Sequence, residues 1–140
     1  MAQAADVRPP GWVPASIAAG IAFAATVVYV TLIVLQGGDE EPIAVIVIAA
    51  YLAGLGVCAL IGGRRSDPDR VIPLGAATGG LIGSAMIAIF SIGLLLLPAG
   101  ACALAAWMRA SVGATRHHQL LGGAAAVAAP LLFLFFVLFV

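Results

Sequence analysis

The sequence predicts an all-α integral membrane protein, folded as a compact bundle of five transmembrane helices. Three observations lead to this prediction. Of the 140 residues, 64% are hydrophobic and only 9% are charged, whereas soluble domains carry about 25% charged residues. The apolar residues also form runs long enough to cross a bilayer. Finally, all six basic residues are arginines, and a five-span chain places every one of them on the same side of the membrane.

The first two spans are delimited by polar segments. We expect residues 1–14 to be a short polar lead in an extended conformation, and residues 15–140 to form a single transmembrane helical domain. The first span covers about 15–36 and the second about 42–62. The acidic turn 39–41 separates them, and its carboxylates complement the positive N-terminal end of the second helix.

The uncharged run 71–108 decides the number of spans. It contains 38 residues, which as one helix would extend about 57 Å, against a hydrocarbon core of about 30 Å. Helices tilt by about 20° on average, so tilting cannot absorb the difference. We therefore expect two spans, about 71–90 and 93–109, joined by a turn near Phe90–Gly93. The alternative is a four-span chain in which residues 97–108 form a re-entrant or interfacial segment.

The arginines predict the orientation of the chain. With a last span over about 119–140 and a cytoplasmic N-terminus, all arginines lie inside and the acidic turn lies outside, as the positive-inside rule prefers. Four spans would leave Arg109 and Arg116 outside. The absence of lysine beside abundant Ala, Gly and Val is typical of a GC-rich genome. We expect a multi-pass protein of a bacterial inner (plasma) membrane, with the N-terminus cytoplasmic and the C-terminus outside. The residues assigned to topology and to lipid headgroups are Arg64, Arg65, Arg70, Arg109 and Arg116.

Six small residues of the third expected span recur at four-residue spacing in two adjoining rows. They are Gly75, Gly79 and Gly83 in the first row, and Ala76, Gly80 and Ser84 in the second. In lipid, close backbone contact through small residues drives helix association. The two rows therefore predict a helix-packing face, whose partner is either another span of the same chain or another subunit.

The sequence argues against several kinds of chemistry. Apart from Arg109, the last residue of the fourth, the expected spans contain no charged residue, whereas proton relays and ion-coupled transporters place ionisable groups there. His117 and His118 are adjacent and have no nearby ligand to complete a metal site, and Cys58 and Cys102 form no CxxC motif. A net charge of zero argues against a nucleic-acid partner. We expect no catalytic, cofactor-binding or metal site, and no enzyme.

These features favour a non-enzymatic accessory or scaffolding subunit of a membrane complex, or a homo-oligomer. The expected partners are membrane lipid and either a second copy or another membrane subunit, through the small-residue helix faces. The alternative is a small transporter, channel or holin-like pore formed between protomers. Its weakly polar path would use hydroxyl groups of the spans, namely those of Thr26, Tyr29, Thr31, Tyr51, Thr78 and Ser84.

Overall fold

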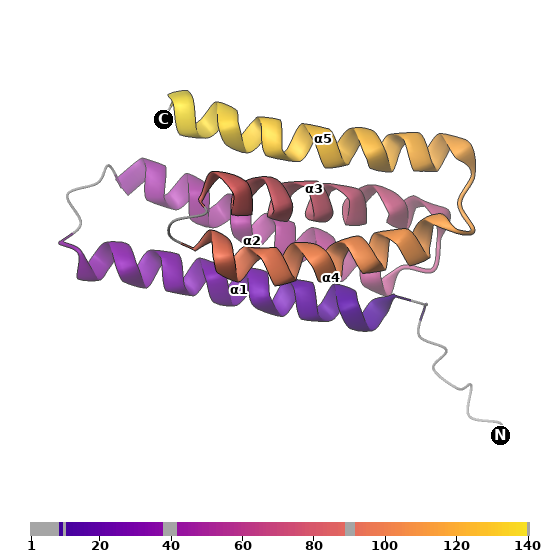
Figure 1. Cartoon of the computed structure of the whole chain (residues 1–140), viewed down its shortest axis with the longest axis horizontal. Helices are drawn as coiled ribbons and strands as arrows, with labels where there is room; N and C mark the ends of the chain where they lie inside the picture. Colours follow the sequence, from indigo (N-terminus) through magenta and orange to yellow (C-terminus); the bar gives the residue numbers. More distant parts are fainter. Residues whose placement is uncertain (1–8, 10, 38–41, 89–91, 140) are drawn as a thin grey trace, which may run out of the picture.

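A computed structural model of the chain describes residues 9, 11–37, 42–88 and 92–139. In this part, five long α-helices lie side by side, consecutive helices run in opposite directions, and no strand occurs (Figure 1). The helices are α1 (Trp12–Leu35), α2 (Pro42–Arg64), α3 (Val71–Ile87), α4 (Gly93–Ser111) and α5 (Arg116–Phe139), with a short 3-10 helix, η1 (Pro68–Arg70), before α3. With η1 counted as part of α3, all five are long and apolar enough to cross a membrane.

The start of α1 differs from the sequence-based expectation. The helix begins at Trp12 rather than near Ala15, so the end of the expected extended lead is helical. Gly11, with a φ of 97°, turns the chain into the helix. Pro14 falls in the first turn, where a backbone N–H would have no intrahelical acceptor, so its missing donor has no cost there.

The long apolar run folds as two helices. α3 ends at Ile87, and α4 is a continuous helix of 19 residues through the segment 97–108, for which a re-entrant course was the alternative. Residues 89–91, at the centre of the expected turn, lie outside the described residues. The Gly93 N–H donates to the Ala88 carbonyl across this turn, at 2.8 Å. A Cβ on Gly93 would lie 2.5 Å from that carbonyl oxygen, so glycine is required for the return.

The last helix also starts earlier than expected. α5 begins at Arg116 instead of Gln119. The fourth helix likewise continues beyond its expected end to Ser111, which leaves a short connection over residues 112–115. The Gln119 side-chain Nε2 donates to the carbonyl oxygens of Ser111 and Ala114, at 2.9 and 3.3 Å. Through these two hydrogen bonds, the first turn of α5 holds both the end of α4 and the connection that follows it.

The central helix of the bundle is α3, which contacts α2, α4 and α5. α1 packs on α2 and α4, away from α5 (Figure 1). α5 lies against α3 along its length and has few contacts with α2. Half of the apolar window of α3 is buried, against 11% for α5. The C-terminal helix is therefore a peripheral element, held mainly by the helix that carries the glycine rows.

Small side chains line the interior of the bundle, and large aliphatic side chains face outward. α1 buries alanines 15, 18, 19, 22 and 25, and α4 buries alanines 99, 103, 106 and 110. Leucines complete the core, the fully buried ones being Leu52, Leu74, Leu81 and Leu96. Exposed side chains include Val34 and Leu35 on α1 and Phe135 and Phe139 on α5, whose rings stand 4.7 Å apart. The outer surface of the described helices is apolar along most of its length.

Candidate functional site

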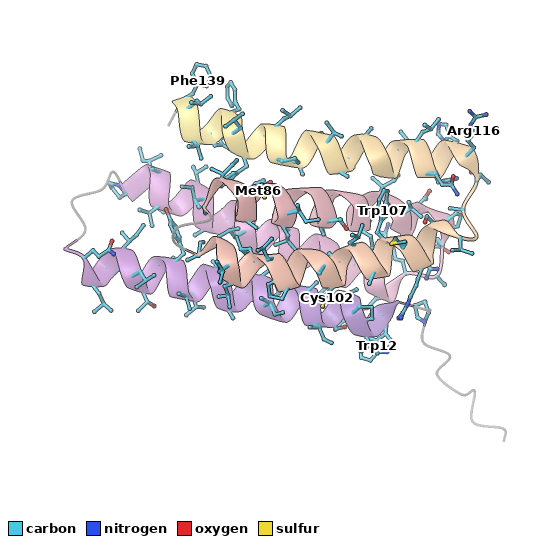
Figure 2. All side chains as sticks on the ribbon, in the orientation of Figure 1. Trp12, Met86, Cys102, Trp107, Arg116 and Phe139 are labelled. Carbon is cyan, nitrogen blue, oxygen red and sulfur yellow. The ribbon has the colours of Figure 1, made fainter. Side chains whose placement is uncertain are left out.

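The arginines assigned to topology gather at one end of the bundle. Arg64, Arg65 and Arg70 lie where α2 passes into η1, while Arg109 and Arg116 flank the connection between α4 and α5. Figure 2 places Arg116, Trp12 and Trp107 toward this end, which we call the arginine end. Arg8 and the acidic residues 39–41 lie outside the described residues. The helix ends that flank the acidic turn, those of α1 and α2, lie at the opposite end of the bundle.

A side-chain contact at the arginine end joins two segments that are distant in sequence. His118 Nε2 on α5 lies 3.0 Å from Asp69 Oδ1 on η1, and His118 Nδ1 lies 2.6 Å from the Thr115 hydroxyl. His117 contacts His118 edge to face, with ring centroids 5.7 Å apart. Among the described residues, no group of three or more His, Cys, Asp or Glu could hold a metal ion. The contact joins the start of α5 to η1, and because the Asp69 carboxylate is exposed it contributes little to stability.

The first glycine row lies directly against α5. The facing positions are Gly75 with Gly122, Gly79 with Ala126, and Gly83 with Pro130. Because α3 and α5 run in the same direction (Figure 1), the pairs advance together by four residues on each helix. A Cβ on either of the first two glycines would overlap a carbonyl oxygen of α5, and a Cβ on Gly83 would overlap the Pro130 ring. The two backbones are therefore in contact, and glycine is the residue that permits it.

The second row faces a different helix. A Cβ on Gly80 would lie 2.7 Å from Leu55 Cδ1 and 3.0 Å from the Tyr51 hydroxyl, both on α2. Ser84 is buried, and Ala76 forms part of the floor between α2 and α5. The two adjoining rows thus place α3 between α5 on one side and α2 on the other.

Tyr51 makes the hydrogen bond that links α2 to α5. Its hydroxyl donates to the Ala129 carbonyl at 2.7 Å, and its ring stacks on Phe133 with centroids 5.0 Å apart. The Ser84 hydroxyl neighbours that of Tyr51, but the two are outside hydrogen-bonding geometry and Ser84 Oγ has no partner among the described residues. The Tyr51 proton is directed at the Ala129 carbonyl.

The other hydroxyl groups proposed for a polar path are mostly satisfied within their own helices. Thr26, Thr31 and Thr78 each donate to the carbonyl four residues earlier, at 2.7 to 2.9 Å. Tyr29 and Ser84 share one cavity, while Tyr51 borders a separate groove. Tyr29 and Ser84 on one side and Tyr51 on the other therefore border two separate spaces.

A groove of about 510 Å³ runs between α2 and α5 on the outside of the bundle. Its walls carry Gly54 and Cys58 on α2 and Ala125 and Ala128 on α5, and Ala76 of α3 lies at its floor. A Cβ on Gly54 would meet nothing within 4 Å. This groove, which we call the α2–α5 groove, exists because both helices pack on α3 and contact one another little. The sequence contains small residues on both helices, but their spacing alone does not show that they face one another.

The described part of the chain is thus an all-helical bundle with five helices of membrane-spanning length and apolarity. No protein-family model, no curated protein and no solved structure matches the chain. Its function is inferred from the chemistry and shape of the chain itself.

Proposed function

We propose that this protein is a multi-pass protein of a bacterial inner membrane and serves as a non-enzymatic accessory or scaffolding subunit. In this proposal it docks a further transmembrane helix, from a partner subunit or a second copy, in the α2–α5 groove. The observation that carries the proposal is the groove itself, which is open on the outer surface and is lined by small residues together with Tyr51, Leu55 and Leu132.

Dimensions and charge support the membrane placement. α4, at 19 residues, extends about 28 Å, close to a hydrocarbon thickness of about 30 Å. α1 and α5, at 24 residues each, exceed that thickness. The described charged residues lie at the arginine end and leave the helix walls apolar. By the positive-inside rule this end is cytoplasmic, and its arginines contact anionic lipid headgroups.

Helix packing inside the bundle supports the docking role. Between α3 and α5, small residues bring two backbones into contact, which is how helices associate in lipid, where hydrophobic driving force between them is weak. The α2–α5 groove offers the same residue types without a covering helix. Gly54 and Ala128 are exposed there. A helix entering the groove would therefore reach the backbones of α2 and α5 and pack closely against both.

The test compares two glycines that are alike except in position. Gly54 lies in the groove, whereas Gly20 lies on α1, and both are exposed with nothing within 4 Å of an added Cβ. We expect the wild-type protein, extracted in mild detergent, to have the mass of an assembly. Gly54→Leu should reduce it to the mass of one chain, while Gly20→Leu should leave the assembly intact. A wild-type protein with the mass of a single chain, or equal assembly in both variants, would contradict the proposal.

A further inference from the structure

The two halves of α5 are held in different ways. The N-terminal half, residues 116–129, lies on α3 through the first glycine row, and the last contact of that row is Gly83 with Pro130. α3 ends at Ile87, one turn after Gly83, whereas α5 continues to Phe139 (Figure 1). Within the C-terminal half, residues 131–139, only Phe133 is buried. The close backbone contact with α3 therefore ends at Pro130.

The C-terminal half of α5 also packs loosely against α2. A cavity of about 180 Å³ is lined by Phe133 and Val137 of α5 together with Ile48 and Leu52 of α2 and residues of the other three helices. A second cavity, of about 100 Å³, lies between Phe136 and Val137 and the first half of α2. Atoms that border empty space lose van der Waals contact, which is the interaction that holds helices together in lipid. The C-terminal half of α5 is therefore the most weakly held part of this helix.

Pro130 stands at the boundary between the two halves. It has no backbone N–H, so the Ala126 carbonyl loses its helical donor, and a helix bends most readily at such an interruption. At the same level, the Tyr51 hydroxyl of α2 donates to the Ala129 carbonyl at 2.7 Å, and the Tyr51 ring stacks on Phe133. Tyr51 thus holds α5 to α2 beside the interruption.

We propose that Pro130 is a hinge, on which the C-terminal half of α5 swings away from α2 and back while the N-terminal half stays on α3. The swing carries Phe133 and Val137 with it, so it opens the two cavities to the surrounding lipid and closes them again. Opening costs little van der Waals contact, because the cavities already separate the two helices. The Tyr51 contacts hold the closed state. This hinge does not depend on the proposed docking role.

The test measures distances between pairs of spin labels by pulsed electron paramagnetic resonance. The full chain, with both native cysteines replaced by alanine, is reconstituted in lipid nanodiscs. One pair of labels replaces Ile43 and Leu138, across α2 and the C-terminal half of α5. The matched pair replaces Ile61 and Leu121, across the same two helices on the other side of Pro130, and all four positions are exposed. We expect a broad or two-peaked distance distribution for the first pair and a single narrow one for the matched pair.

Two substitutions test whether the proline and the tyrosine have these roles. Pro130→Ala restores an N–H for the Ala126 carbonyl and should narrow the distribution of the first pair. Tyr51→Phe removes the hydrogen bond to α5 and should shift that distribution toward longer distances.

A third pair of labels distinguishes a hinge from ordinary fraying of helix ends. It joins Val34 of α1 to Ile43 of α2, which lie at the same end of the bundle in helix segments that no proline interrupts. This pair should give a narrow distribution. The proposal is overturned if the first pair is as narrow as the matched pair, if Pro130→Ala leaves it broad, or if the third pair is equally broad.

Discussion

One Cα–H bond of Gly79 points at the carbonyl oxygen of Ala126, because a Cβ built in that direction would overlap the oxygen. The Ala126 carbonyl lacks the hydrogen-bond donor that a helix normally supplies. Its helical donor would be the backbone N–H of residue 130, and Pro130 has none. A Cα–H group is a weak hydrogen-bond donor, so the close approach of Gly79 partly satisfies this carbonyl. The glycine on α3 and the proline on α5 thus belong to one packing arrangement.

The first prediction concerns this contact. Gly79→Ala should lower the free energy of unfolding by about 1–3 kcal/mol, the usual cost of overpacking, because the new methyl group forces α5 away from α3. The measurement is unfolding by denaturing detergent in mixed micelles, followed by circular dichroism.

The matched control for this substitution is Gly123→Ala on α5, where an added Cβ meets nothing within 4 Å. There the substitution should be neutral or stabilise by up to about 1 kcal/mol, because alanine loses less conformational entropy in a helix. Equal effects at both positions would contradict the close packing of α3 on α5.

The second prediction concerns Tyr51. Tyr51→Phe should lower stability by about 0.5–1.5 kcal/mol, the net worth of one hydrogen bond, because it removes the bond to the Ala129 carbonyl and keeps the ring stack on Phe133. Amide hydrogen exchange in α5 should also rise near Ala129, since this bond ties α5 to α2. Unchanged exchange in α5 together with unchanged stability would show that the bond does not hold the helix.

The third prediction concerns Ser84. Ser84→Ala should raise the free energy of unfolding by about 1–3 kcal/mol, the cost of a buried polar group without a partner. Most substitutions of buried residues act in the opposite direction, so the sign is diagnostic. Thr78→Val is the comparison, because it removes a buried hydroxyl that donates to Leu74 at 2.7 Å and should be destabilising. A loss of stability in Ser84→Ala would mean that the hydroxyl has a partner after all.

The number and approximate bounds of the helices could be predicted because each depends on local composition. The run 71–108 exceeds one bilayer thickness and must fold back, and Gly93 supplies a residue suited to the turn. The start of α1 differs from the expected bound because Pro14 lies in the first turn of the helix, where a proline is compatible with helical structure.

The partners of each helix could not be predicted in the same way. Spacing shows that Gly75, Gly79 and Gly83 form one face, but the helix opposite that face depends on how the five helices are ordered around the bundle. The Tyr51–Ala129 bond and the Asp69–His118 pair join segments remote in sequence. The cavity beside Ser84 needs all five helices at once. No short pattern encodes such contacts, because they arise from the relative rotation of packed helices.

The central claim, a five-span chain with its arginine end in the cytoplasm, is tested most directly by cysteine accessibility. In a background with Cys58→Ala and Cys102→Ala, single cysteines replace Gln36, Ser66, Ser91 and Val112, and intact cells are treated with a membrane-impermeant maleimide. Gln36 and Val112 are exposed in the structure. We predict labelling at 36 and 91, and labelling at 66 and 112 only after the membrane is made permeable. Labelling at 112 in intact cells with protection at 66 would contradict the five-span topology.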